Sequence, residues 1–318
     1  MRALMLIAAL VAAAPAFAQG QWPDRPVRVV VPFPPGGGTD VVARTVTNRL
    51  ATAFGQPFVI ENRPGAGGTI GSDAVARSAP DGYTLGIATS STHPAAVALL
   101  RNVPYDPVAS FTAITQIGFT PYILVGGPAS RGTTLQEFLA AARANPGAMN
   151  YASVGSTTLG YLLTRQFEML ANIRMTHVPY RGSSQVYPDL INGTVAVLLD
   201  NPTGSAGLVR EGRLRAFAVT TPSSALPDVP TFESLGVRGF DAPFWYGLVA
   251  PAGTPPAIAQ RIQQEVARHF TGTAEGRAEL TGKDVTPSAT SPEAFARTIA
   301  EDTTRWRGLA QRLGIQPE

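Results

Sequence analysis

The 318-residue sequence contains no cysteine, and this absence excludes several kinds of chemistry. Without cysteine there are no disulfide bonds, no thiolate metal sites and no cysteine nucleophile. A cysteine-linked lipid anchor is excluded for the same reason. The fold must therefore be held by its hydrophobic core, and a chain of about 300 residues has room for two domains.

Lysine is nearly absent as well, since Lys283 is the only one. The net charge is +3 and basic residues do not cluster, which argues against a nucleic-acid partner. A phosphate-binding P-loop needs a lysine directly after its glycines, and the triple glycine at 36–38 is not followed by one. The same glycines do not have the dinucleotide-binding spacing, so we predict no nucleotide.

Histidine is scarce, and no catalytic set forms around the three that occur. His177 lies in an apolar strand pattern and His269 lies late in an amphipathic helix pattern, so we interpret both as structural. His93 is the only one beside a loop rich in hydroxyl groups. The chain has no G-x-S-x-G motif, no H-E-x-x-H motif and no carboxylate cluster. We therefore predict no enzyme activity, no metal site and no cofactor.

Long apolar runs are absent except at the start of the chain. Arg2 precedes the apolar run Leu4–Ala14, and Ala16-Phe17-Ala18 fits the small-x-small rule for signal peptidase. The run is shorter than the roughly 20 residues that a membrane-spanning helix needs. We predict a signal peptide over residues 1–18, cleaved after Ala18, and an exported protein without a lipid anchor.

Strand and helix patterns alternate along the rest of the chain, which predicts an α/β fold with largely parallel sheets. The expected strands cover residues 27–31, 58–60, 83–88, 111–117, 122–125, 150–152, 175–178, 195–199, 214–219 and 246–249. The expected helices cover residues 40–54, 135–144, 186–191, 255–270 and 291–313, and two more end at 76 and 170. Thr133 and Gln136 are expected to form a capping box for the helix 135–144. Pro121 and the stretch 241–245 are expected to carry the chain between two lobes.

The most informative stretch is VRVVVPFPPGGGTD, residues 27–40. A buried strand stops at Pro32, three glycines follow, and Thr39 and Asp40 are candidate helix caps. This order directs several unpaired backbone N–H groups at one point, and such a point attracts anions. We predict an anion-binding loop; the alternative is a tight turn whose glycines serve packing only.

Hydroxyl side chains recur where predicted strands end, and ligands collect at such ends. They are Thr89, Ser90 and Ser91 after one strand and Ser153, Ser156, Thr157 and Thr158 after another. Each hydroxyl can donate a hydrogen bond to a carboxylate, although each can equally cap the next helix. Phe33, Tyr180 and Trp245 are aromatic candidates for packing on a ligand, with a place in the core as the alternative.

Eight stretches, in order along the chain, resemble the Bug (TctC-type) extracytoplasmic solute receptors, the binding components of tripartite tricarboxylate transporters. They are WPDRPVRVVVPFPPGGGTDVVAR (22–44), ENRPGAGGTIG (61–71), APDGYTL (79–85), YDPVASF (105–111), HVPYRG (177–182), LRAFAVT (214–220), LPDVPTFESLG (226–236) and APAGTP (250–255). The resemblance implies a two-lobe periplasmic-binding-protein fold of type II-like architecture. Each lobe would be a mostly parallel sheet flanked by helices, with the ligand cleft between the lobes. The first lobe would comprise residues 19–122 and 243–318, and the second residues 123–242.

The resemblance also implies a periplasmic location and a function. Such a receptor captures a small carboxylate (a dicarboxylate, an acidic amino acid or an aromatic acid) and delivers it to membrane permease subunits; we expect a monomer. The implied ligand-binding residues are Phe33, Pro35, Gly36, Gly37, Thr39, Thr89 and Ser90 in the first lobe, and Ser153, Gly155, Thr158, Tyr180 and Asp200 in the second. Asp200 would pair with a ligand amino group, repel a second carboxylate or cap a helix. A sensor that presents its closed form to a membrane signalling partner is the alternative, and a periplasmic enzyme is the less favoured one.

Four positions depart from the family pattern. Thr157 stands where glycine is usual, Tyr161 where histidine is usual, Arg181 where lysine is common and Ala196 where aspartate is common. The side chain of Thr157 is expected to leave less room for the backbone of this segment to reach the ligand. The identity of the ligand therefore cannot be carried over from a relative.

Overall fold

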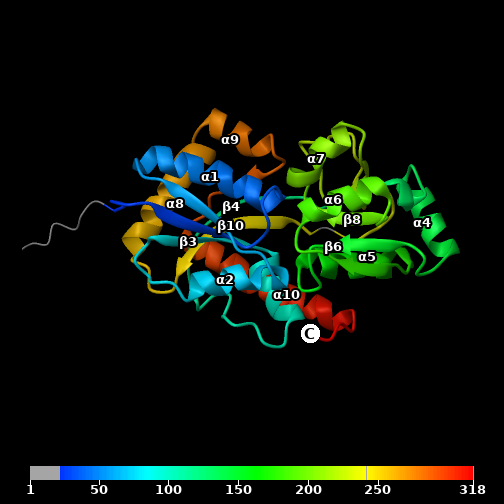
Figure 1. The fold of residues 1–318 in the computed structure, drawn as a ribbon, viewed down its shortest axis with the longest axis horizontal. Coiled ribbons are helices and arrows are strands. Elements are labelled where there is room, and N and C mark those ends of the chain that lie inside the picture. The colour runs from blue at the N-terminus through cyan, green and yellow to red at the C-terminus, as the bar shows by residue number, and fades with distance from the viewer. Residues whose placement is uncertain (1–21, 241, 318) are drawn as a thin grey trace, which may run out of the picture.

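A computed structural model describes residues 22–240 and 242–317, which form two sheets flanked by helices (Figure 1). The predicted signal peptide lies outside the described residues. The first sheet, in the order β11-β4-β10-β3-β1-β2, consists of β1 (Val27–Val31), β2 (Phe58–Asn62), β3 (Thr84–Thr89), β4 (Phe111–Thr120), β10 (Phe244–Pro251) and β11 (Thr286–Pro287). The second, in the order β7-β6-β8-β5-β9, consists of β5 (Ile123–Gly126), β6 (Asn150–Ser153), β7 (Thr176–Pro179), β8 (Val197–Asp200) and β9 (Arg215–Val219).

Helices cover both sheets, and they follow the sheet to which the neighbouring strands belong. With the first sheet lie α1 (Gly38–Phe54), η1 (Ala66–Gly68), α2 (Thr69–Ala76), η2 (Ser91–Ala95), α3 (Ala96–Leu99), α8 (Pro256–Phe270), α9 (Ala274–Thr281) and α10 (Pro292–Arg312). With the second lie η3 (Pro128–Ser130), α4 (Leu135–Ala144), α5 (Leu159–Ala171), α6 (Ser183–Asn192) and α7 (Pro202–Arg210). Within the described residues, none of these helices combines the length and the apolar character needed to span a membrane.

The chain passes between the sheets twice, once from β4 to β5 and once from β9 back to β10. These passages lie where the sequence predicts them, at Pro121 and just before Phe244. Thr220 joins the two passages, because its Oγ1 accepts the N–H of Tyr122 at 2.9 Å and donates to the carbonyl of Ala242 at 3.2 Å. The exact lobe boundaries, 122/123 and 242/243, stay a prediction.

The sheets are mixed, which corrects the expectation of mostly parallel sheets. β1 runs parallel to β2 and β3, and β6 runs parallel to β7 and β8. In contrast, β10 is antiparallel to β3 and β4, and β5 is antiparallel to β8 and β9. The reason is topological: β5 and β10 are entered from the other sheet and not over a crossover helix, so they are free of the parallel direction that such helices impose.

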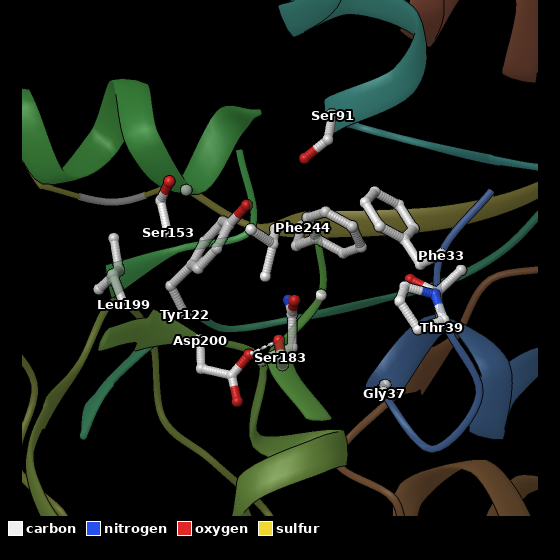
Figure 2. Close-up of a pocket in the computed structure, with 16 residues that line it drawn as sticks. Phe33, Gly37, Thr39, Ser91, Tyr122, Ser153, Ser183, Leu199, Asp200 and Phe244 are labelled. Atoms are coloured by element: carbon white, nitrogen blue, oxygen red, sulfur yellow. Dashed lines mark hydrogen bonds between the residues drawn. The ribbon is translucent and has the colours of Figure 1, made fainter. Parts of the chain in front are cut away.

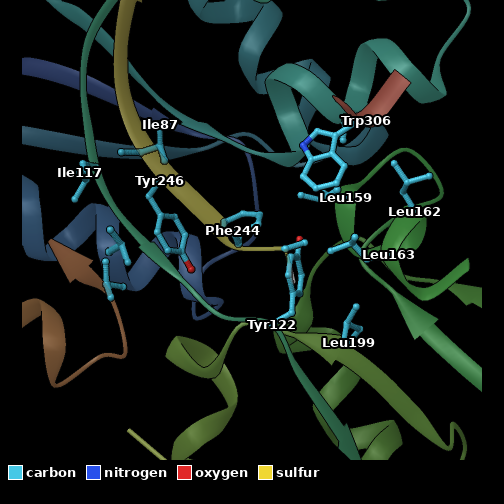
Figure 3. Packing of buried hydrophobic residues seen from close by; sticks show 14 of the residues in the cluster. Ile87, Ile117, Tyr122, Leu159, Leu162, Leu163, Leu199, Phe244, Tyr246 and Trp306 are labelled. Carbon is cyan, nitrogen blue, oxygen red and sulfur yellow. The ribbon is translucent and has the colours of Figure 1, made fainter. Parts of the chain in front are cut away.

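One hydrophobic core continues through the passage between the sheets (Figure 3). Tyr122 packs edge-on against Phe244, with ring centroids 5.7 Å apart, and Phe244 packs edge-on against Tyr246 at 4.9 Å. All three rings are buried. The connection between the two parts is therefore built of aromatic side chains with little room to change their packing.

The two parts also touch away from the passage. Ser91, at the start of η2, accepts the backbone N–H of Leu159, at the start of α5, at 3.1 Å. The ring of Pro34, before α1, faces Gly182, before α6, so closely that a Cβ on Gly182 would lie 2.5 Å from Pro34 Cδ. The two parts are thus in direct contact outside the two passages.

Asp284 makes an extensive polar contact between the start of the return passage and the turn between α9 and β11. It is buried in the turn between α9 and β11 and accepts four hydrogen bonds from Ser223–Ala225, the segment that follows β9. The donors are the hydroxyl groups of Ser223 (2.6 Å) and Ser224 (2.8 Å) and the backbone N–H groups of Ser224 (2.6 Å) and Ala225 (3.1 Å). Asp284 thereby ties the start of the return passage to the first part of the molecule.

Candidate functional site: a cavity between the two sheets

A cavity lies between the two parts and takes its lining from both (Figure 2). From the first part come Phe33, Pro34, Gly37, Gly38, Thr39, Ser91 and Phe244. From the second part and the first passage come Tyr122, Ser153, Val154, Gly160, Gly182, Ser183, Leu199, Asp200 and Asn201. The position between two lobes is one where ligands usually bind.

The N-termini of four helices meet at this cavity. Gly37 caps α1, Gly182 caps α6 and Asn201 caps α7, and Gly160 lies in the first turn of α5. The first N–H groups of a helix have no partner inside the helix and carry partial positive charge. Four such ends around one cavity favour a ligand that carries negative charge.

Side-chain donors add to these backbone groups. The hydroxyls of Ser91 and Ser153 line the cavity, and Tyr122 lies between them in Figure 2. Burial raises the pKa of Tyr122 well above its usual range, so its hydroxyl keeps its proton. Asn201 Nδ2 is buried and has no hydrogen-bond partner among the described residues. An oxygen-rich ligand would supply the acceptor that this amide lacks.

Apolar side chains form the rest of the wall. Phe33 and Phe244 lie side by side in Figure 2, and Leu199 lies on the far side of Tyr122. Such a wall packs against a hydrocarbon chain or an aromatic ring.

Asp200 is the one acidic side chain in the lining, and its carboxylate is already engaged. Ser183 donates to Oδ1 at 2.7 Å and Tyr187 donates to Oδ2 at 2.8 Å. Burial raises the pKa of Asp200, while these hydroxyls and the N-terminus of α7 act in the opposite direction. The geometry shows Asp200 holding the start of α6 in place; a direct contact with ligand stays a prediction.

Of the twelve residues predicted to bind ligand, five line the cavity: Phe33, Gly37, Thr39, Ser153 and Asp200. The others lie nearby without lining it. Pro35 and Gly36 are exposed, and Thr89 and Ser90 are buried, with Thr89 bonded to Thr92 and Ser90 to the backbone N–H of Trp245. Gly155 and Thr158 bond to each other, and the hydroxyl of Tyr180 donates to Asp189 at 2.6 Å.

Among the aromatic candidates, Phe33 lines the cavity and Trp245 is buried in the core, with its Nε1 donating to Asp302 at 2.7 Å. Sequence reasoning missed Tyr122, Phe244, Ser183 and Asn201. Asn201 had a readable signal, since Asn-Pro is a typical helix start. Tyr122 and Phe244 flank the two predicted passages, which places them at the cleft once the lobes are known.

Asp40 organises the glycine loop from the first turn of α1. Its side chain is 4% exposed and accepts two hydrogen bonds from Arg44 (2.8 and 3.0 Å), one from Asn62 Nδ2 (2.9 Å) and one from the Gly36 N–H (3.1 Å). The Gly36 amide is therefore used inside the loop, whereas Gly38 and Thr39, the first residues of α1, line the cavity. Burial opposes ionisation of Asp40, but the bonds from Arg44, Asn62 and Gly36 outweigh it and lower its pKa.

We expect Asp40→Asn to lower the free energy of unfolding by about 2 kcal/mol at pH 7, because charge-assisted hydrogen bonds are lost. A carboxylate with a lowered folded pKa stabilises the fold above its unfolded pKa, and this contribution is lost as the pH falls through the folded pKa. The difference between variant and parent should therefore shrink toward pH 3. Urea unfolding at both pH values measures it.

Asp73→Asn is the matched control, because Asp73 and Arg77 form the same i,i+4 pair on α2 with the arginine 70% exposed. An exposed pair contributes little, so this variant should lose less than about 0.5 kcal/mol. Equal losses in the two variants would show that the loop network around Asp40 contributes nothing beyond a surface ion pair.

Comparison with known proteins decides the family. The family model described as "Tripartite tricarboxylate transporter family receptor", TctC, matches residues 42–315. The chain belongs to the TctC family. This result confirms the resemblance found in the sequence.

Relatives of this TctC protein match nearly its whole length. Protein BugT of Bordetella pertussis is 35% identical over 302 residues, which cover 93% of this chain and 91% of BugT. The structure of R. palustris Rpa4515 with adipate superposes with a TM-score of 0.88 at 34% identity, covering 93% of this chain and 100% of that one. MatC from Rhodopseudomonas palustris with bound malate has a TM-score of 0.85 at 33% identity, covering 91% and 99%. The TctC chain thus has the two-lobe periplasmic-binding-protein fold expected from its sequence.

Proposed function

We propose that this protein is a periplasmic solute receptor that captures a small carboxylate between its two lobes. Family membership supports a role as the receptor of a tripartite transporter, and the residues that line the cavity support the binding of a carboxylate. The observation that carries the proposal is the meeting of four helix N-termini, with α1 from one lobe and α5, α6 and α7 from the other. An anion in contact with both sets stabilises the closed form.

The donors around the cavity are enough for useful affinity. A hydrogen bond to a charged group contributes about 1.5–3 kcal/mol. Three or four of them, after the cost of ordering ligand and lobes, support a dissociation constant near ~1 μM, or about −8 kcal/mol. The wall of Phe33, Phe244 and Leu199 adds apolar contact for an aliphatic or aromatic ligand body.

The finer parts of the proposal concern partners and location. The signal peptide is cleaved after Ala18, and the mature chain works as a monomer in the periplasm without a lipid anchor. The closed form is then recognised by the permease subunits of a tripartite transporter, since only closure brings surfaces of the two lobes together. Relatives with adipate and with malate in their structures support a dicarboxylate as the first ligand to try.

A thermal-shift panel tests the proposal. We expect one or more of succinate, malate, adipate, glutamate and benzoate to raise the melting temperature, whereas glucose does not. A ligand at 100 times its dissociation constant stabilises the folded state by about 2.7 kcal/mol. Stabilisation by glucose alone would contradict the anion site.

Gly37→Val sharpens the test within the same panel. Gly37 has extended backbone, and an added Cβ would meet only the Pro34 carbonyl oxygen at 3.9 Å, so the fold tolerates a side chain there. The new side chain enters the cavity wall, and we expect the affinity for the stabilising acid to fall by at least about tenfold. Gly207→Val on α7, where a Cβ meets nothing within 4 Å, is the control. Equal binding by both variants would show that the loop is only a turn.

A further inference from the structure

Ser153 forms part of the cavity wall, and its hydroxyl bonds to a histidine behind that wall. Ser153 ends β6 and is 2% exposed. Its Oγ lies 2.7 Å from Nε2 of His177 on β7, and it accepts the backbone N–H of Gly155 at 3.1 Å. The protonation state of the histidine therefore acts on an atom at the ligand site.

Packing holds the His177 ring in the orientation that this bond needs. His177 is opposite Tyr151 in the parallel pairing of β6 and β7, and the two rings stack with centroids 5.0 Å apart and planes 28° apart. Tyr161 of α5 packs on the same ring at 4.8 Å. With rings on two sides, the imidazole has little freedom to turn Nε2 away from Ser153.

Two titratable side chains pack against this ring, those of Tyr151 and Tyr161. Arg165 and Glu168 of α5 act electrostatically on Tyr151. Arg165 and Glu168 pair with each other at 2.8 Å, so their charges largely cancel. His177 itself is only half-buried, which leaves its ring accessible to protons from solvent.

A serine hydroxyl has one proton and two lone pairs, so its partners decide what it offers to a ligand. When Nε2 of His177 accepts, the Ser153 proton points at the histidine, and Ser153 presents only a lone pair to the cavity. When His177 is protonated, Nε2–H donates to Ser153 Oγ, and the Gly155 N–H occupies the second lone pair. The hydroxyl proton is then released for a hydrogen bond to a carboxylate in the cavity.

We propose that His177 is a positioning residue that sets the direction of the Ser153 hydroxyl and thereby couples carboxylate binding to pH. The inference rests on the proposed function, because it needs an anionic ligand beside Ser153. Its sign is fixed by linkage: the carboxylate binds the protonated form more tightly, so binding takes up a proton. Affinity is therefore highest below the His177 pKa and falls as the pH rises through it.

The first test needs no ligand. ¹⁵N NMR of histidine side chains distinguishes a ring nitrogen that carries a proton from one that accepts. The chain has three histidines, and His177→Gln identifies the His177 signals by their loss. Above the pKa of His177 we expect Nε2 to be the accepting nitrogen, and below it both nitrogens carry protons. A neutral His177 with the proton on Nε2 would overturn the proposal, whatever the protein binds.

The second test measures affinity for adipate and for malate by calorimetry between pH 6 and pH 8. We expect the wild-type protein to lose about tenfold in affinity over this range, the equivalent of one hydrogen bond, with proton uptake visible as a buffer-dependent heat. The affinity of His177→Gln should change less than twofold over this range. Because the acids titrate in the same way with either protein, comparison with this variant also removes any effect of their own protonation. Ser153→Ala should bind weakly at every pH.

His177→Phe keeps a ring between Tyr151 and Tyr161 but cannot be protonated. It therefore separates the effect of ring packing from the effect of histidine protonation. We expect it to behave as His177→Gln does, with a flat pH profile. Parallel pH profiles for the wild type and both His177 variants would overturn the proposal. If neither acid binds wild-type protein at any pH, the proposed carboxylate function is contradicted. The tautomer found by NMR still decides whether neutral His177 accepts the Ser153 proton.

Discussion

Gly182→Val is expected to reduce carboxylate affinity by at least about 100-fold while each lobe stays folded. The backbone of Gly182 is extended, with φ of −179°, so a branched side chain is not strained there. The obstacle lies in the other lobe, because the added Cβ would sit 2.5 Å from Cδ of Pro34, and a proline ring cannot move aside. The variant must keep the lobes apart and forfeit every hydrogen bond that the ligand makes across the cleft, a loss of two or more bonds to a charged group.

Two measurements separate this mechanism from a general defect. The unfolding transition should stay within about 1 kcal/mol of the parent protein, since the clash exists only on closure. In small-angle scattering, the wild-type radius of gyration should fall when adipate or malate is added, and that of the variant should not change. Gly207→Val, which adds the same side chain in open space on α7, should bind normally.

Pro34→Ala in the Gly182→Val background is the decisive control, because it removes the ring atoms that the valine meets. Partial recovery of affinity is expected. If the single variant binds as tightly as wild type, closure through Pro34 and Gly182 is not required for binding.

Asp284→Gly is expected to lower the free energy of unfolding by about 3 kcal/mol. The carboxylate accepts from two hydroxyls and two backbone N–H groups of Ser223–Ala225, and its removal takes this acceptor from the buried Ser223 hydroxyl and from two part-buried backbone N–H groups. Glycine is the informative substitution, because Asp284 has φ of +59° and alanine would add backbone strain at the same time. The melting temperature should drop by roughly 5–10 °C for a chain of this size.

Asp284→Ala and Asp284→Asn complete the series. Alanine should cost about 1 kcal/mol more than glycine, since a left-handed backbone penalises a Cβ. Asparagine tolerates that backbone and keeps one acceptor oxygen, so it should be the mildest of the three. A loss below about 1 kcal/mol for Asp284→Gly would show that the four hydrogen bonds are replaced by water.

The strands were predictable because burial imposes a continuous apolar run that is visible in the sequence. β1 matches its predicted residues, and the ends of most other strands differ from prediction by one to three residues. Direction within the sheet was not predictable in the same way. β5 and β10 run antiparallel because the chain enters them from the other sheet, and no local pattern records this.

Helix starts show how local signals compete. Thr133 with Gln136 and Thr134 with Glu137 both fit the capping-box pattern, and the structure uses the second, in which Thr134 accepts the Glu137 N–H at 3.2 Å. Asp40 was a candidate cap, yet α1 begins at Gly38 and Asp40 instead holds the Gly36 amide and Arg44. The sequence pattern offers several partners for each of these side chains and does not decide among them.

The candidate site was partly predictable for a related reason. Phe33, Gly37 and Thr39 belong to one local strand-turn-helix unit, and their neighbourhood follows from the sequence alone. Ser183 and Phe244 reach the cavity from segments far away in the chain, and only the closed packing of the lobes makes them its neighbours. Gly182 and Pro34 are the same case, since their contact exists only across the cleft.

The hydroxyl of Thr220 has a mechanical consequence. It holds the first passage at Tyr122 and the second at Ala242, so neither segment bends without the other. Bending of one passage therefore strains or breaks a hydrogen bond to the other, so the two connections between the lobes are coupled through this one side chain.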